Sequence, residues 1–176
     1  MTGQHNTGAT YALSLSGSTS ITAGTGVTLE SLNNNTGTIA LLSSGGINGG
    51  SGTVLMRAAN YAFGGADRTI TTTGVLTIEP DADENSFASS FDNQYLNPVS
   101  VTGLTLGKSS NASAITLSRA ISLSGPVSIY GGSIDVNANI TANSGNILLD
   151  ADTGSTLNQS STGILLDDVI TIETVT

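Results

Sequence analysis

The chain has 176 residues and a formal net charge of −9, with 10% charged and 4% aromatic residues. Four basic residues provide no positive surface for nucleic acid. No apolar run is long enough to span a bilayer as a helix. Without cysteine there can be no disulfide, thiolate metal site or thiol nucleophile, and one histidine cannot form a histidine metal cluster. We expect neither nucleic-acid binding nor membrane insertion.

Residues 1–20 form a polar N-terminal segment, in which the alternation Tyr11-Ala-Leu-Ser-Leu15 predicts a possible edge strand. These first residues lack the charged and apolar regions of a signal peptide, so we expect the chain to be a piece of a longer protein. Gly, Ser, Thr and Asn make up nearly half of the chain, and all four are weak helix formers. Short aliphatic stretches between them predict a single all-β domain over 21–176, with loose spacing before residue 79.

An acidic segment, 79–98, interrupts this pattern and is bracketed by Pro80 and Pro98. Phe87, Phe91 and Tyr95 are spaced as on one face of a helix, which predicts a short helical insertion that leaves the domain and returns at residue 99. The three rings could stack on sugar rings or contact a protein partner. They could also simply pack the insertion against the domain.

The same segment carries oxygen ligands in a calcium-loop pattern. Asp81, Asp83, Asn85 and Asp92 occupy positions 1, 3, 5 and 12 of such a loop. Position 6 is Ser86 where the pattern has glycine, and position 12 is aspartate where it has a bidentate glutamate. The alternative is a solvated acidic loop without a metal ion.

The most regular spacing lies between residues 115 and 149. Six short apolar stretches, five of them with the order apolar–polar–apolar, follow one another there at nearly even intervals, and three intervals together span about 20 residues, the length of a short solenoid repeat. A period of this length made of three short strands predicts a three-sided parallel β-helix, or β-solenoid. At this period the whole chain would form roughly nine coils around one aliphatic core. The stretches begin at Ile115, Ile121, Val127, Ile134, Ile140 and Ile147.

One tetrapeptide occurs twice, as Ile147-Leu-Leu-Asp150 and Ile164-Leu-Leu-Asp167. If the two copies stack on adjacent coils, Asp150 and Asp167 lie about 5 Å apart, one strand spacing. A carboxylate pair at this distance could bind a cation such as calcium, or act as the two acids of a retaining glycosidase. The plainer interpretation is a row of solvated surface acids.

The repeats resemble those of a known family. The runs 101–108, 114–125 and 132–142, which read VTGLTLGK, AITLSRAISLSG and GSIDVNANITA, are similar to the repeat regions of large filamentous-haemagglutinin-like exoproteins. The resemblance covers residues 100–150 well and 20–78 more weakly. These exoproteins are bacterial surface adhesins, often exported by two-partner secretion. The resemblance implies a right-handed parallel β-helix, export, and a role as a stalk or adhesive surface.

We therefore expect a non-enzymatic, extracellular structural or adhesive segment at the bacterial cell surface, acting as an adhesin stalk or a self-assembling fibre subunit. No catalytic residues are assigned, and calcium is the only cofactor considered. Its expected partners are other copies of the chain, end to end or laterally, or surface glycans and proteins. One alternative is a carbohydrate-binding module that uses the aromatic segment. Another is a polysaccharide-degrading β-helix enzyme that uses the paired acids.

Overall fold

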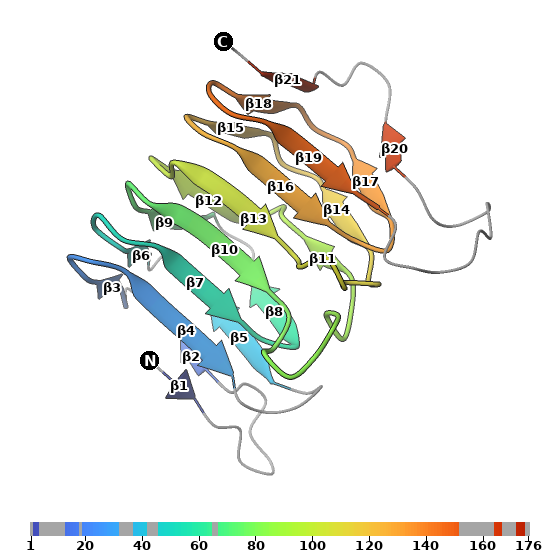
Figure 1. Cartoon of the computed structure of the whole chain (residues 1–176). Coiled ribbons are helices and arrows are strands. Elements are labelled where there is room, and N and C mark those ends of the chain that lie inside the picture. The colour runs from blue at the N-terminus through green and yellow to red at the C-terminus, as the bar shows by residue number, and fades with distance from the viewer. Residues whose placement is uncertain are drawn as a thin grey trace.

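The structure is a computed structural model of the chain, and it describes residues 2–3, 13–17, 19–31, 37–41, 46–64, 67–151, 164–166 and 172–174. Every regular element in these ranges is a β-strand, and all strand pairs are parallel. The strands stack along one axis, with the N- and C-termini at opposite ends of the stack (Figure 1). The predicted all-β, parallel β-solenoid is thereby confirmed.

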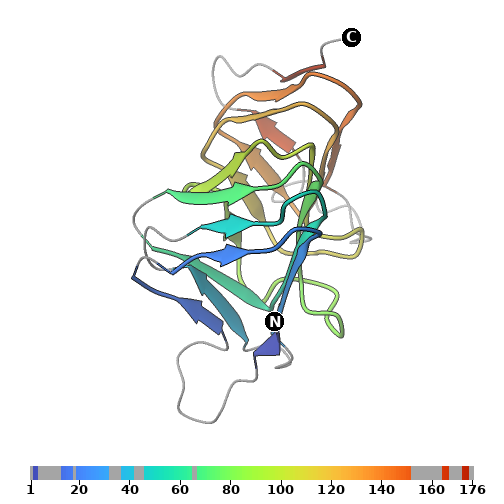
Figure 2. The same ribbon diagram turned by 90° about the vertical axis from the view of Figure 1, so that its left-hand side faces the viewer.

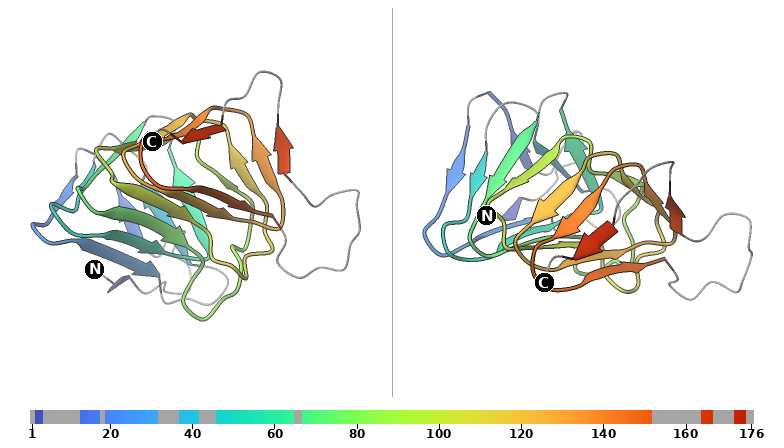
Figure 3. Two further views of the ribbon diagram at one scale, coloured as in Figure 1. Left: turned by 45° about the horizontal axis from the view of Figure 1, so that its top comes forward. Right: turned by 90° about the horizontal axis from the view of Figure 1, so that it is seen from above.

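The strands form three rows, because a strand pairs with the strand three positions further along the chain, apart from two interruptions. Seen from the side (Figure 2) and from above (Figure 3), the chain passes from row to row at each bend. This pairing is consistent with a three-sided coil. The first row contains β1 (Thr2–Gly3), β4 (Val27–Ser31), β7 (Val54–Arg57), β10 (Val75–Glu79), β13 (Gly103–Leu106), β16 (Val127–Tyr130) and β19 (Ile147–Asp150).

The second and third rows are each interrupted once, whereas the first row is one continuous sheet. In the second row, β2 (Leu13–Leu15), β5 (Thr38–Leu41) and β8 (Asn60–Phe63) form one sheet, and β11 (Phe91–Asp92), β14 (Ile115–Leu117), β17 (Ile134–Val136) and β20 (Ile164–Leu166) form another. In the third row, β3 (Ile21–Thr22), β6 (Ile47–Asn48), β9 (Arg68–Thr71) and β12 (Leu96–Val99) are separated from β15 (Ile121–Leu123), β18 (Ile140–Ala142) and β21 (Ile172–Thr174).

The short period predicted from the sequence is correct only in the regular part of the chain. There Ile115 pairs with Ile134, and Val127 with Ile147. Elsewhere the coils are longer, because Val27 pairs with Val54. Longer coils use more of the chain, so the first row holds seven strands where the period predicted roughly nine coils.

An aliphatic core runs through the stack. Strand side chains alternate between inside and outside, as in β17, where Ile134 and Val136 are buried and Asp135 between them is partly exposed. In-register positions of neighbouring strands stack, so Ile134 lies between Ile115 and Ile164. Such columns of Ile, Val and Leu share one core that no single coil could enclose.

Glycines at the bend before the first row allow successive coils to approach closely. A Cβ atom at Gly52 would lie 1.7 Å from the carbonyl oxygen of Thr25 on the preceding coil. One at Gly74 would lie 2.5 Å from the carbonyl oxygen of Gly52. Both distances are far inside van der Waals contact, so only glycine fits at these two positions.

The predicted helical insertion over 79–98 is wrong. Residues 80–90 form an irregular loop, and the chain is back in the stack at β11, well before residue 99. Phe91 pairs with Ile115, and Leu96 pairs with Arg68. The helical spacing of the aromatic residues is therefore produced by a loop followed by two short strands.

Asn111 fastens this loop to the next coil. Its side chain is fully buried, and its Oδ1 accepts hydrogen bonds from the backbone N–H groups of Phe87 and Ser113, each at 3.2 Å. Its Nδ2 donates to the carbonyl oxygen of Tyr130 at 2.8 Å. One amide thus satisfies backbone groups on three successive parts of the stack, which fixes where the loop lies.

Candidate functional site

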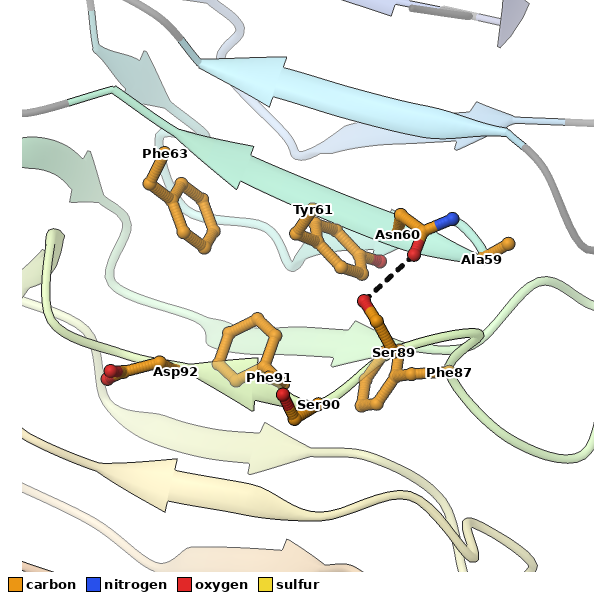
Figure 4. A pocket seen from close by; sticks show the side chains of 9 residues that line it. All are labelled: Ala59, Asn60, Tyr61, Phe63, Phe87, Ser89, Ser90, Phe91 and Asp92. Carbon is orange, nitrogen blue, oxygen red and sulfur yellow. Dashed lines mark hydrogen bonds between the residues drawn. The ribbon is translucent and has the colours of Figure 1, made fainter.

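Four aromatic rings meet inside the stack, at the interruption of the second row. Tyr61 and Phe63 come from β8, Phe87 from the 80–90 loop and Phe91 from β11. Their ring centroids lie 5.6–6.2 Å apart, with Tyr61 edge-on to both Phe87 and Phe91. These spacings are typical of stabilising aromatic pairs. We call these four residues the aromatic cluster (Figure 4).

The aromatic cluster coincides with the split of the second row. Tyr61 and Phe63 stand in register with the buried Ile39 and Leu41 of β5, so aromatic rings replace aliphatic side chains in these columns. Between β8 and the segment that leads into β11, the backbones meet at one end, where the N–H of Ala88 donates to the carbonyl of Ala59 at 2.8 Å. The ladder is thus missing at the position where aromatic rings from β8, the 80–90 loop and β11 meet.

A narrow cleft remains where the two strands diverge. It is lined by Ala59, Asn60, Tyr61, Phe63, Phe87, Ser89, Ser90, Phe91 and Asp92 (Figure 4). Its volume is about 30 Å³, which admits a water molecule and not a sugar ring. Ser89 Oγ donates to Asn60 Oδ1 at 2.9 Å across the mouth.

Two of the three predicted ligand-binding aromatics belong to the core. Phe87 and Phe91 are 4% and 3% exposed, and their faces pack against Tyr61, Phe63 and each other. Tyr95 is partly exposed and lies just before β12, where its carbonyl accepts a hydrogen bond from the N–H of Arg68 at 2.7 Å. The geometry favours the packing interpretation over a stacking platform for sugars.

Burial also changes the chemistry of Tyr61. Its hydroxyl is enclosed and lies 2.8 Å from the carbonyl oxygens of both Met56 and Glu79, so it donates to one of them at a time. Desolvation, followed by the nearby Glu79 carboxylate, raises the pKa of Tyr61 well above its usual value near 10. The hydroxyl is therefore held neutral, as a structural hydrogen-bond donor.

The four predicted calcium ligands of the acidic segment differ in their positions and in the residues that they contact. Asp92 lies on β11, and its carboxylate accepts hydrogen bonds from the N–H of Gln94 at 2.9 Å and from Ser118 Oγ at 3.0 Å. Asp83 and Asn85 are exposed on the 80–90 loop. Asp81 is buried, and its carbonyl oxygen accepts from Lys108 Nζ at 3.2 Å.

The stacking predicted for the repeated tetrapeptide is wrong. β19, which ends at Asp150, pairs with β16 in the first row, whereas Ile164–Leu166 of the second copy pairs with β17 in the second row. The two strands therefore lie in different sheets. Asp167 lies outside the described residues. Among the described residues, no three His, Cys, Asp or Glu side chains are grouped so that they could hold a metal ion.

The sequence did not reveal two sets of ion pairs between coils. Arg57 lies in register between Glu30 and Glu79, and its Nε donates to Glu79. This hydrogen bond is the main cause that raises the pKa of Arg57. Arg119 forms a bidentate pair with Asp67, which comes much earlier in the chain, and this pair lowers the pKa of Asp67. Only the register, which the variable coil lengths conceal, brings these residues together.

No helix long and apolar enough to cross a membrane occurs in the described part of the chain. The chain matches no family model, no curated protein and no solved structure. The fold agrees with one implication of the resemblance noted in the sequence, namely that the chain is a β-helix repeat region.

Proposed function

We propose that the chain is a non-catalytic, structural segment of an exported bacterial surface protein, either an adhesive stalk or a fibre subunit. The observation that carries this proposal is the continuous seven-stranded parallel sheet of the first row. A ladder of this kind transmits force along the stack through backbone hydrogen bonds, which suits a spacer. The similarity of residues 100–150 to adhesin repeats supports the extracellular location.

The polysaccharide-degrading alternative is less well supported. It required the acids of the two tetrapeptides to stack, and their strands lie in different sheets. Glu30 and Glu79 lie in the same column of the first row, on either side of Arg57, and both form ion pairs with it. Both carboxylates are therefore engaged in ion pairs in the folded chain.

Two measurements test the proposal. Negative-stain electron microscopy of the purified chain at increasing concentration tests the fibre subunit, and filaments are the supporting result. Beads coated with the chain and incubated with cultured epithelial cells test the adhesive stalk, with albumin-coated beads as the control. If there are no filaments and the chain-coated beads adhere no better than the albumin beads, the proposal fails. Dispersal of filaments by EDTA would support the predicted calcium dependence.

A further inference from the structure

The outer face of the third row carries a shallow groove that none of the predicted sites includes. Its residues come from three successive coils, β3, β6 and β9 with the positions just before them. The floor is formed by β6 together with Gly46, which has no side chain. The side chains of β3 and β9 form the two walls. The lining residues are Ser20, Ile21, Thr22, Gly46, Ile47, Asn48, Thr69 and Thr71.

The register explains why these residues gather. Ile21 pairs with Ile47, which pairs with Ile70, so the residues on either side of each isoleucine point outward in two columns. Both of these coils are longer than the period of the regular part of the chain, so the sequence pattern conceals the alignment. Thr22 and Thr71 stand on opposite walls, two strand spacings or about 10 Å apart.

Of the four hydroxyl groups in the groove, Ser20 Oγ accepts a hydrogen bond from the N–H of Gly46 at 3.3 Å. Within the described residues, the side chains of Thr22, Thr69 and Thr71 make no hydrogen bond. Threonines at the bends behave differently: Thr72 Oγ1 donates to the carbonyl of Gly50 at 3.2 Å, and Thr102 Oγ1 to that of Thr73 at 2.5 Å. Three threonine hydroxyls in the groove are therefore available to a ligand, whereas Thr72 and Thr102 at the bends are occupied.

The amide of Asn48 is also available, and it is held in place. Its Oδ1 accepts a hydrogen bond from the N–H of Gly50 at 2.9 Å, which fixes the side chain and leaves Nδ2 to donate outward. No lining residue is charged, although the chain as a whole carries a net charge of −9. The methyl groups of the threonines add apolar contact area between the hydroxyls. Such a surface matches a neutral, hydroxyl-rich ligand and does not select an ion.

We propose that this groove binds a neutral glycan, with a sugar ring seated over Gly46 between the walls of β3 and β9. The groove volume of about 170 Å³ is smaller than that of a typical pocket for a drug-sized ligand, and it suits one ring at a time. The glycan hydroxyls exchange hydrogen bonds with the threonine hydroxyls and with Asn48 Nδ2. This inference rests on the proposed adhesive function for its biological role, but binding itself is measurable without cells.

The test uses an array of immobilised neutral glycans (β-1,4-glucan, α-1,4-glucan, chitin oligosaccharides and mannan) beside sulfated and sialylated glycans. The full chain is compared with the double variant Thr69→Ala/Thr71→Ala. The matched control is Thr77→Ala/Thr105→Ala, which removes two outward-facing threonines from the first row. Circular dichroism and thermal unfolding establish that all three proteins fold.

We expect binding to at least one neutral glycan, weakened about tenfold by Thr69→Ala/Thr71→Ala because two hydrogen bonds of modest net strength are lost. The control should bind within about twofold of the unchanged chain. Binding to anionic glycans only, no binding to any glycan, or equal loss in both variants would overturn the inference. Filaments or cell adhesion observed together with a negative array would overturn the glycan site alone and leave the proposed function standing.

Discussion

At the scale of single residues, glycine determines how closely the coils stack. The bend before the first row places Gly52 against Thr25 and Gly74 against Gly52, each with a backbone carbonyl where a Cβ atom would be. A side chain there cannot be accommodated by a rotamer change, because the obstacle is backbone. Gly24, in the same bend, has open space where its Cβ would be. Comparing substitutions at Gly52 and Gly24 therefore separates the effect of close packing from that of glycine's backbone freedom.

Gly52→Ala should lower the free energy of unfolding by about 2–4 kcal/mol, because the added methyl group forces the coils apart at Thr25. Gly24→Ala should change it by less than about 1 kcal/mol and could raise it, since alanine restricts the unfolded chain. Urea unfolding followed by circular dichroism measures both. Equal effects of the two substitutions would contradict the close-packing argument.

The raised pKa of Tyr61 predicts how the free energy of unfolding depends on pH in the alkaline range. Its pKa is raised in the folded chain, so between about pH 10 and that raised value the unfolded state loses a proton that the folded state keeps. The stability contributed by the neutral hydroxyl is complete below pH 10. It then falls with rising pH, at most by about 1.4 kcal/mol per pH unit.

Tyr61→Phe should cost about 1 kcal/mol at pH 7, where a hydrogen bond is lost, and should flatten the decline above pH 10. Urea midpoints measured from pH 8 to 11 test this. Tyr130→Phe is the control, because Tyr130 is a partly exposed first-row residue outside the aromatic cluster. The argument fails if Tyr61→Phe and Tyr130→Phe have the same pH profile.

At the scale of elements, the split of the second row leaves backbone groups without a ladder partner. The N–H groups of Asn60 and Gly64 donate to Gly37 and Leu41 on the β5 side. Alternate residues of a strand point their N–H groups to opposite sides. Those of Tyr61 and Phe63 therefore face β11, with which β8 forms no ladder.

Hydrogen exchange should report this alternation within a single strand. The amides of Tyr61 and Phe63 should exchange at least about tenfold faster than those of Asn60 and Ala62, because the latter are held in the ladder with β5. Residue-resolved NMR exchange on the folded chain measures the four rates. The control is β7, which is paired on both sides and should show no alternation. Uniform protection along β8 would mean that the second row is continuous in solution.

The sequence predicts elements well where bends are short. Between residues 115 and 149 each bend has close to the minimum length, so apolar spacing shows the register directly. The coil from Val27 to Val54 is longer than the regular period, and nothing in the local pattern indicates which apolar residue stacks on which. Phe87 and Phe91 have a helical spacing only because a loop followed by a strand happens to place them four residues apart.

Sites are harder to predict than strands, because every proposed pairing depends on the register. The two copies of Ile-Leu-Leu-Asp, at 147 and 164, suggest neighbours in one column, but the strand of the second copy lies in the next row. Conversely, Arg119 and Asp67 form a bidentate pair that no local spacing reveals. An identical tetrapeptide is weak evidence for stacking when coil lengths vary.

At the scale of the whole molecule, the stack combines one unbroken face with two broken ones. The first row continues from β1 to β19, whereas the second row is interrupted between β8 and β11 and the third between β12 and β15. The two interruptions lie on successive coils. Core packing continues across both of them, so side chains and the remaining backbone ladder hold this region together.

This asymmetry has a mechanical consequence. Tension along the axis falls mainly on the continuous first row, because its backbone hydrogen bonds run along the axis and link each coil to the next. Bending that opens the gaps of the second and third rows meets no backbone ladder there, only side-chain contacts and isolated backbone hydrogen bonds such as that from Ala88 to Ala59, so the molecule flexes most easily toward its unbroken face. A stalk built from such segments would resist extension along its length and would bend easily in one direction. Its tip could therefore swing under fluid flow without lengthening.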